Sequence, residues 1–248
     1  MNKVIAIIPA RYRSSRFPGK ALADIFGKPM VYWVYTRVAK SQLLDQCVVA
    51  TDDKRIVEAC EQYNIPVIMT SEEHVNGTER VAEVARMKDA DIIINVQGDE
   101  PLITPETVDV VVKALQDDPT LEYVQAAKRI EQLTDLVDAT VVKIAVAQDG
   151  RALYLSRSPI PYPRATHGYA AYKHIGVYGY RAKFLFEFVA MGESPLEKIE
   201  GIEQLRALEY GRVLKIVEVQ HDTVSIDTPA DLERIKKEYA HEFINTVV

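Results

Sequence analysis

Hydrophobic positions in the first half of the chain follow two patterns that alternate. Apolar runs of four to six residues, typical of buried parallel strands, are separated by segments in which apolar residues recur every three or four positions, as in amphipathic helices. The predicted strands are 4–8, 46–50, 66–69 and 91–96, and the predicted helices are 29–40, 52–63, 77–88 and 104–115. This alternation predicts an α/β fold with a doubly wound, mostly parallel sheet.

The pattern changes after Asp118-Pro119, where strands follow one another with fewer helices between them. The predicted strands are 123–128, 141–147, 152–156, 173–180 and 213–219, and the predicted helices are 182–191, 196–210 and 228–243. Pro159, Pro161 and Pro163 exclude regular structure and predict a stiff connector. We therefore expect one domain over residues 1–248, with a smaller strand-and-helix insertion that covers the mouth of the sheet or forms a subunit interface.

The segment that follows the first predicted strand is rich in positive charge. Its cations are Arg11, Arg13, Arg16 and Lys20. Because burying each unpaired charge costs several kcal/mol, the segment is either a solvated loop or a site for an anionic ligand. Its position at the carboxyl end of a strand, where open α/β sheets bind ligands, favours the second interpretation. Gly19 and the small Ser14 and Ser15 would let backbone N–H groups approach phosphate oxygens.

The basic segment matches neither of the two familiar phosphate-binding motifs. No G-x-G-x-x-G is present, and Ser14 stands where a Walker loop ending in Gly19-Lys20 needs its first glycine. The sequence therefore predicts neither an ordinary dinucleotide fold nor a P-loop.

Two aspartates are candidates for binding a magnesium ion. Asp99 follows the predicted strand 91–96 in NVQGDEP, and Asp227 precedes the terminal helix in VSIDTP. Mg²⁺ usually takes one or two carboxylates together with substrate phosphates, so two such acids beside a basic loop predict a nucleotide–metal site. The alternatives are a turn-forming role for Asp99 and a helix cap for Asp227. We expect Glu100 to face solvent or to cap the next segment.

Several further polar residues are candidates for contact with ligands. Arg80, at the start of a predicted helix in NGTER, either reads the edge of a base or forms a first-turn charge pair. In Thr51-Asp52-Asp53 the simpler role is to cap the next helix, with Asp52 as the expected cap. The candidates in the second half are Arg157, Arg164, His174, Tyr178, Glu203 and Gln204. Arginine is suited to bidentate capture of a carboxylate, although each of these residues also has an ordinary structural role open to it. No Ser–His–Asp or Cys–His arrangement and no general base is identifiable.

Composition restricts the classes of partner. A formal net charge of −6 argues against broad binding to nucleic acid or to an anionic membrane. Cys47 and Cys60 have no metal-ligand spacing and are expected to be buried thiols. We expect no signal peptide, and no apolar run approaches the ~20 residues of a transmembrane helix. A reducing cytoplasm fits these features.

The motifs, in their order along the chain, resemble those of one enzyme family. They are IPARYRSSRFPGK, VATDD, NGTER, NVQGDEPLI, LYLSRSPIPYPR, KHIGVYGYR, EQLRALEYG and IDTPADLE. This series, over residues 5–234, is similar to that of the 3-deoxy-manno-octulosonate (KDO) cytidylyltransferases. The first motif alone resembles sugar nucleotidyltransferases in general, whereas KHIGVYGYR and EQLRALEYG narrow the resemblance to the KDO-activating branch.

This resemblance implies a fold, an activity and a set of site residues. The fold is that of the nucleotide-diphospho-sugar transferases, and the enzyme is a Mg²⁺-dependent cytoplasmic homodimer that converts CTP and KDO to CMP-KDO and pyrophosphate for lipopolysaccharide or capsule. Residues of about 120–220 would form the acid-sugar pocket and the dimer interface. The nucleotide residues would be Arg11, Ser14, Arg16 and Lys20 for phosphate and Arg80 for cytosine, with Asp99 and Asp227 holding magnesium. The acid-sugar pocket would contain Arg157, Arg164, His174, Tyr178, Glu203 and Gln204.

Four positions depart from the commoner family pattern, and three alternative functions remain open. The departures are Arg13, whose role we cannot assign, Ala21, Asn76 and Glu79. The alternatives are transfer to the 8-amino analogue of KDO or another acid sugar, a non-catalytic nucleotide-binding protein on the same scaffold, and a metal-dependent glycosyltransferase. The segment KHIGVYGYR disfavours sialic acid as the acceptor.

Overall fold

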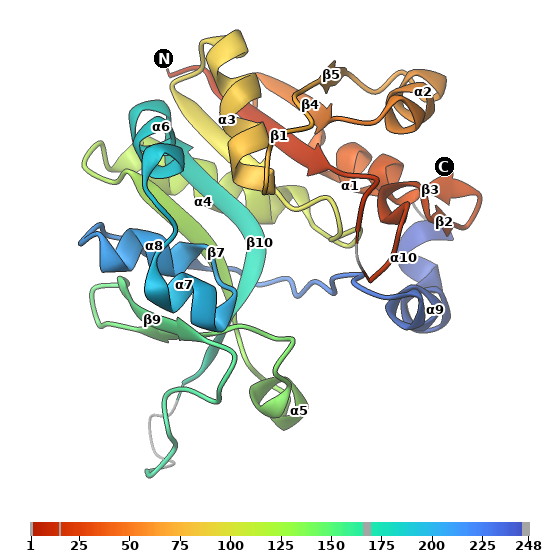
Figure 1. Ribbon diagram of the computed structural model, residues 1–248. Helices are drawn as coiled ribbons and strands as arrows, with labels where there is room; N and C mark the ends of the chain where they lie inside the picture. Colours follow the sequence, from red (N-terminus) through yellow and green to blue (C-terminus); the bar gives the residue numbers. More distant parts are fainter. Residues whose placement is uncertain (1, 15, 166–169, 245–248) are drawn as a thin grey trace.

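A mixed β-sheet passes through the centre of the protein, with helices on both of its faces (Figure 1). The computed structural model describes residues 2–14, 16–165 and 170–244, so Ser15 of the predicted phosphate loop lies outside the described residues. Within these ranges the sheet has nine strands, in the order β11-β7-β10-β6-β1-β4-β5, with β8 paired to β10 and β9 paired to β8. The strands are β1 (Val4–Ala10), β4 (Gln46–Thr51), β5 (Val67–Met69), β6 (Ile92–Val96), β7 (Tyr123–Arg129), β8 (Lys143–Val146), β9 (Ala152–Ser156), β10 (Tyr172–Arg181) and β11 (Lys215–Glu218).

The directions of the strands confirm the predicted mostly parallel sheet. Strands β6, β1, β4 and β5 pair in parallel, and β11 pairs in parallel with β7. Strand β10 is antiparallel to both β6 and β7, so β7 runs in the same direction as β6. The carboxyl ends of β1, β4 and β6 therefore lie along one edge of the sheet, where open α/β sheets bind their ligands.

Alternate side chains of β1 pack into different cores. Ile5 and Ile7 lie in a core formed with α3 and α6, whereas Ala6 and Ile8 lie in a core formed with α1, α2 and α4. This period of two is the pleat of a strand buried on both faces. The helices are α1 (Met30–Val38), α2 (Lys54–Gln62), α3 (Gly77–Lys88), α4 (Pro105–Asp117), α5 (Leu133–Val137), α6 (Ala182–Ala190), α7 (Pro195–Glu200), α8 (Gln204–Glu209), α9 (Pro229–Glu238) and α10 (Ala240–Ile244).

The carboxyl-terminal helices cover the outer side of α1. Trp33 on α1 packs against Phe243 of α10, with ring centroids 5.0 Å apart, and Leu232 and Ile235 of α9 complete a third core. Figure 1 shows α9 and α10 beside α1 and beside the small hairpin of β2 (Asp24–Ile25) and β3 (Lys28–Pro29). None of the helices within the described ranges has the length and apolar character needed to cross a membrane.

Two predicted helices are each divided in the structure, so these two predictions were wrong. The predicted helix 196–210 is α7 and α8, separated at Gly201, whose φ of 63° lies in the left-handed region that glycine adopts without strain. The predicted helix 228–243 is α9 and α10, separated at Tyr239. The sequence pattern did not predict α5 or the hairpin of β2 and β3.

The cap of α2 also differs from the prediction. Asp53, rather than Asp52, is the N-cap, because its carboxylate accepts the backbone N–H of Arg55 at 2.9 Å. Asp52 is free of this role and instead forms an ion pair with Arg80.

Candidate active site

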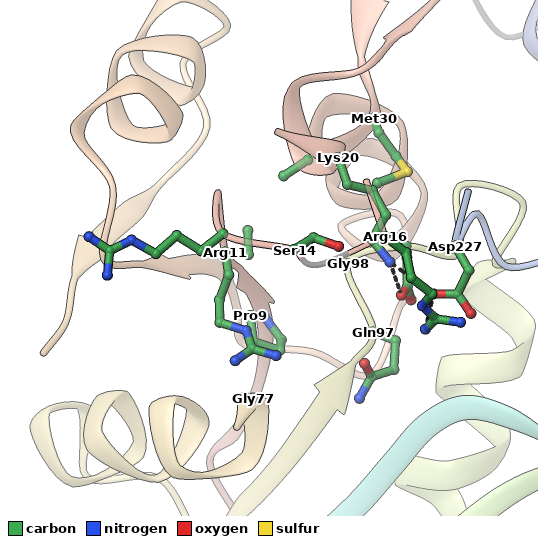
Figure 2. Close-up of a pocket in the computed structure, with 14 residues that line it drawn as sticks. Pro9, Arg11, Ser14, Arg16, Lys20, Met30, Gly77, Gln97, Gly98 and Asp227 are labelled. Atoms are coloured by element: carbon green, nitrogen blue, oxygen red, sulfur yellow. Dashed lines mark hydrogen bonds and ion pairs between the residues drawn. The ribbon is translucent and has the colours of Figure 1, made fainter. Parts of the chain in front are cut away.

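A polar cavity of about 470 Å³ lies at the carboxyl edge of the sheet. It opens where β1 and β6 end and where the basic segment begins (Figure 2). Its lining includes Arg11, Arg13, Ser14, Arg16, Lys20, Gly77, Gln97, Gly98, Asp99 and Asp227. The structure thus brings the four cations and Ser14 of the predicted phosphate loop, and both predicted metal-binding aspartates, to one cavity.

Two carboxylates share one ammonium group in this cavity. Lys20 Nζ lies 2.7 Å from Asp99 Oδ2 and 3.3 Å from Asp227 Oδ1, and Arg16 Nη2 lies 3.0 Å from Asp227 Oδ1. Figure 2 shows the side chains of Lys20, Arg16 and Asp227 close to one another. Asp227 does not act as a helix cap, because the cap of α9 is Thr228 with its partner Asp231. The alternative structural role for Asp227 is therefore excluded.

Backbone geometry explains why these groups meet. Gly19 has a φ of 73° and donates its N–H to Tyr12 O at 2.8 Å, so the basic segment turns back before Lys20. A Cβ atom on Gly98 would come within 2.7 Å of Pro9 O, so only glycine lets the chain before Asp99 approach the end of β1 this closely. The Ile226 N–H donates to Asp99 O at 2.9 Å and joins the two aspartate-bearing segments.

The two aspartates suit a divalent cation. Both are partly exposed, with 23 % and 31 % of their side chains accessible, so each carboxylate has lone pairs facing the cavity. Mg²⁺ in phosphate-transfer sites takes one or two carboxylates and completes its coordination with phosphate oxygens and water. Within the described ranges, no three acidic, histidine or cysteine side chains form a closed metal cage. The two carboxylates match the number of protein ligands that such an ion usually takes.

A second cavity of about 260 Å³ adjoins the first and shares residues with it. The shared residues are Arg16, Gln97, Asp99 and Asp227. Of the residues assigned to the acid sugar, five line the second cavity: Arg157, His174, Tyr178, Glu203 and Gln204. Arg164, the sixth, is exposed in the connector and lines neither cavity. Asp99 and Asp227 thus lie at the junction of the two cavities.

The second cavity is held by a dense set of hydrogen bonds. The guanidinium of Arg157 donates from Nε to Glu200 O at 2.8 Å and from Nη1 to Ala139 O at 3.1 Å. His174 Nδ1 lies 3.2 Å from the Tyr178 hydroxyl. The Thr78 hydroxyl donates to Glu203 at 2.5 Å and so connects α3 to this cavity.

Burial shifts the titration of the groups that line the second cavity. Desolvation lowers the pKa of His174 to about 4 and raises the pKa of Glu203 to about 7. The pKa of Tyr178 is raised well above its ordinary value for the same reason. His174 is therefore neutral at physiological pH, and it can donate or accept a hydrogen bond but carries no charge.

Glu100 neither faces solvent nor caps a helix, so the prediction for this residue was wrong. Its side chain is buried, and its Oε1 accepts the backbone N–H of Gly176 at 2.8 Å. Burial, together with the neighbouring charge of Asp99, raises the pKa of Glu100 to about 8. The predicted N-cap, Thr104, does cap α4, so Glu100 is not needed for that purpose.

Arg80 lies outside both cavities. Its side chain is fully buried, and its guanidinium pairs with Asp52 at 2.7 Å and donates to Thr70 Oγ1 and Ser71 O. Arg80 does not form the predicted first-turn charge pair either. The neighbouring Glu79 instead accepts the backbone N–H of Val75 at Oε2, at 3.0 Å. The contact of Arg80 with cytosine stays a prediction, and it would require this guanidinium to leave the partners it has here.

A family model described as "Cytidylyltransferase" matches residues 5–239, nearly the whole chain. The chain belongs to the cytidylyltransferase family. As a member of this family it is an enzyme of the nucleotidyltransferase class. The match includes every element that bears a residue of the two cavities.

The relatives of this cytidylyltransferase include enzymes that are named for one acid sugar. A 3-deoxy-manno-octulosonate cytidylyltransferase of Pelobacter propionicus is 46 % identical over 247 residues, covering 95 % of this chain and 97 % of the relative. One of Geobacter sulfurreducens is 47 % identical over 243 residues, covering 94 % and 97 %. The solved structure of CMP:2-keto-3-deoxy-manno-octonic acid synthetase complexed with CTP is 40 % identical, with a TM-score of 0.92, over 97 % of this chain and 100 % of that one.

Several residues that line the two cavities were not assigned from the sequence, among them Gln97, Arg13 and Glu100. Gln97 lines both cavities, and its position directly after β6, in the same turn as Asp99, was the signal that would have identified it. Arg13 lines the phosphate cavity and also a smaller neighbouring cavity of about 180 Å³ that contains Asp52 and Asp53. Its long side chain and its place between two cationic neighbours gave no indication of this second position.

Proposed function

We propose that this cytidylyltransferase transfers CMP from CTP to 3-deoxy-manno-octulosonate, forming CMP-KDO and pyrophosphate. The observation that carries the proposal is the junction of a cation-rich cavity with a second polar cavity at Asp99 and Asp227. A triphosphate suits the first cavity and a polyhydroxylated acid suits the second. The names and near-complete coverage of the relatives support these substrates.

The first cavity would hold the nucleotide. Arg11, Ser14, Arg16 and Lys20 would bind phosphate oxygens, with Lys20 and Arg11 stabilising the negative charge that gathers on the leaving pyrophosphate. Arg11 is already oriented by its hydrogen bond to Val75 O at 3.0 Å. Arg80 would contact cytosine only after its guanidinium leaves Asp52, with which it is paired at 2.7 Å.

The magnesium ion would be held by Asp99 and Asp227, together with phosphate oxygens of CTP. When bound, it supplies charge neutralisation on the phosphates and lowers the pKa of the sugar hydroxyl. The ammonium of Lys20 lies between the same two carboxylates in this structure, which supports a position of favourable potential for a cation. This ammonium can turn to the phosphates once the carboxylates have another partner.

The second cavity would hold the acid sugar. Arg157 suits capture of the carboxylate, because its guanidinium is held in place by backbone carbonyls. Neutral His174 with Tyr178, and Glu203 with Gln204, would hydrogen-bond the sugar hydroxyls. Arg164 is proposed for the same pocket from the exposed connector.

The reaction itself is a direct displacement. The anomeric hydroxyl oxygen of the sugar forms a bond to the α-phosphorus of CTP, and the bond from that phosphorus to the β-bridging oxygen breaks, with the electron pair leaving on pyrophosphate. Such chemistry depends on positioning and charge stabilisation more than on a protein nucleophile. No side chain is assigned as the base that takes the hydroxyl proton.

We further propose that the enzyme is a homodimer in the cytoplasm, where CTP is available. Large exposed apolar side chains within residues of about 120–220 support an interface in this part: Leu133, Val137, Leu153, Tyr162 and Ile199. The same residues of about 120–220 contribute most of the second cavity. We treat the whole of 1–248 as one nucleotidyltransferase domain.

Phosphorus NMR with CTP, Mg²⁺ and KDO tests the proposed reaction. We expect the α-phosphate resonance of CTP to be replaced by that of a phosphodiester, with one pyrophosphate released for each sugar nucleotide. Binding of CTP without pyrophosphate release would contradict the proposal and favour a non-catalytic protein. A higher rate with the 8-amino analogue would reassign the acceptor, and near-normal turnover of Asp99→Ala in limiting Mg²⁺ would contradict the metal site.

A further inference from the structure

We propose that Glu100 is a positioning residue. It holds the part of β10 that carries His174 and Tyr178 in place relative to the turn that carries Asp99. This inference rests on the proposed function in one respect, which is that KDO is taken as the ligand of the second cavity. Glu100 lines the second cavity but was not among the residues assigned to the site from the sequence, and it contacts neither Lys20 nor Asp227 through any hydrogen bond within the described residues.

The turn of residues 97–100 forms hydrogen bonds with both the backbone N–H and the backbone carbonyl of Gly176. The Gly176 N–H donates to Glu100 Oε1 at 2.8 Å, and the Gly176 carbonyl accepts the N–H of Gln97 at 2.8 Å. Glu100 is 5 % exposed, so this hydrogen bond is protected from water. The bond to Glu100 depends on its side chain. The bond from the backbone N–H of residue 97 would form with any residue except proline.

Gly176 lies at an irregularity of β10. Between His174 and Tyr178 the register with β7 shifts, so that the four-residue step on β10 faces a two-residue step on β7, from Ala127 to Gln125. Such a bulge leaves backbone groups without ladder partners, and they must be satisfied elsewhere. Oε1 of the Glu100 carboxyl group satisfies the N–H of Gly176.

The space around Gly176 shows that the contact is close. A Cβ atom at this position would lie 2.5 Å from Glu100 Oε1 and 2.7 Å from Gln97 Cγ. Only glycine therefore lets the bulge of β10 approach the turn of residues 97–100. The pair of Gly176 and Glu100 is a specific fit rather than a general packing contact.

The side chains on either side of this bulge face the second cavity. His174 and Tyr178 both line it and contact each other at 3.2 Å. Asp99, adjacent to Glu100, lies at the junction of the two cavities. Glu100 thus connects the strand that presents the sugar-binding groups to the turn that presents a metal-binding carboxylate.

Simple packing does not explain an acid at position 100. Oε2 of Glu100 is buried and has no hydrogen-bond partner within the described ranges. Burial of a carboxyl group with one oxygen unsatisfied is costly, and an apolar side chain of similar size would avoid that cost. The acceptor role of Oε1 toward Gly176 is what an apolar residue could not reproduce.

Two substitutions at position 100 separate positioning from packing. Glu100→Leu keeps the volume and removes the acceptor, whereas Glu100→Gln keeps an acceptor oxygen of the same reach. We expect Glu100→Leu to raise the KM for KDO about 10–100-fold, as losses in supporting hydrogen bonds do, and to leave the KM for CTP within about twofold. Glu100→Gln is expected to restore the KM for KDO to within about threefold of the wild-type value.

Amide hydrogen exchange of residues 172–178 gives a second readout that does not depend on activity. We expect faster exchange in Glu100→Leu than in the wild-type chain and in Glu100→Gln, with the exchange of α4 unchanged. Equal exchange in all three chains would overturn the proposal, as would equal increases of both KM values or a Glu100→Gln variant that behaves like Glu100→Leu. If Glu100→Leu does not fold, a Glu100→Gln variant with raised KM for KDO alone would still contradict the proposal.

The wild-type chain, measured in parallel, separates this proposal from the proposed function. A wild-type chain that releases no pyrophosphate from CTP and KDO contradicts the proposed function, while the exchange measurement still decides the role of Glu100. Gly192→Ala is a matched control for the preparation of variants, because its added Cβ would meet nothing closer than 3.5 Å.

Discussion

Lys20 is the residue on which the charge of the phosphate cavity depends. Its ammonium is the only group that contacts both Asp99 and Asp227 among the ion pairs of the described residues. In the proposed complex with nucleotide, the same ammonium would be within reach of the phosphates, because it lines the same cavity. By this proposal, a single side chain would balance the carboxylates in the free enzyme and the phosphates in the complex.

Replacement of Lys20 by methionine removes this charge while keeping a long side chain. We expect Lys20→Met to lower kcat by about 10²–10³-fold, which is typical of the loss of one group that stabilises developing charge. Lys113→Met, on the exposed side of α4, is the matched control and is expected to retain full turnover. Steady-state pyrophosphate release measures both, and a Lys20→Met variant with normal kcat would show that this ammonium does not act on the leaving group.

His174 makes the stability of the protein depend on pH. Its pKa of about 4 in the folded chain lies below its ordinary value of 6.5, so the unfolded chain takes up the proton first as the pH falls. The free energy of unfolding therefore loses a contribution between about pH 6.5 and 4. We expect the decrease between pH 7 and 5 to be smaller in His174→Gln, as measured by urea unfolding. Parallel pH profiles for the two chains would contradict the burial of a neutral imidazole.

At the scale of elements, the division between α7 and α8 shows what hydrophobic periodicity cannot predict. The apolar pattern continues across Gly201, and one glycine inside a helix costs only about 1 kcal/mol, so the pattern favoured a single helix. In the structure Arg206 of α8 turns back to Glu197 of α7, with Nε to Oε2 at 2.8 Å and Nη2 to Oε1 at 2.5 Å. The contact between α7 and α8 requires the chain to turn at Gly201. The local pattern of apolar residues does not predict such a contact.

The ion pair of Glu197 and Arg206 is expected to contribute strongly to the folded state. Both side chains are more than nine-tenths buried, so Glu197→Ala would leave a buried guanidinium without its partner. We expect this variant to lose about 3–5 kcal/mol of unfolding free energy. Glu193→Ala, whose carboxylate forms an exposed pair with Lys198, is expected to lose less than about 1 kcal/mol. Urea unfolding of the two variants compares them, and equal losses would argue against a structural role for the buried pair.

The elements that the sequence predicted correctly were those that depend on residues close together along the chain. Thr104-Pro105 predicted the start of α4 because the cap and the proline act within one turn, and the structure has Thr104 as the N-cap. The residues 77–88 have a clear period and were predicted with both ends as observed. Antiparallel placement of β10 between β6 and β7 had no local signal, since pairing partners are distant along the chain.

At the scale of the whole molecule, the phosphate cavity was more predictable than the sugar cavity. Lys20 and Asp99 follow strand ends, and parallel strands bring their carboxyl ends to one edge, so their meeting follows from the fold class. The residues assigned to the acid sugar that line the second cavity follow β9, lie on β10 or lie at the start of α8. Their residue types alone made them candidates for ligand contact, and only the family resemblance assigned them to one pocket. The burial of Arg80 and Glu100 depends on contacts with Asp52 and Gly176 that no spacing in the sequence reveals.

The central claim is that the two adjoining cavities bind CTP and KDO together and join them. Pyrophosphate release with each of the four nucleoside triphosphates, with and without KDO in the presence of Mg²⁺, tests it most directly. We expect release with CTP and KDO together, little with the other three nucleotides, and almost none when KDO is left out. Equal release without KDO, or an equal rate with all four nucleotides, would contradict the claim.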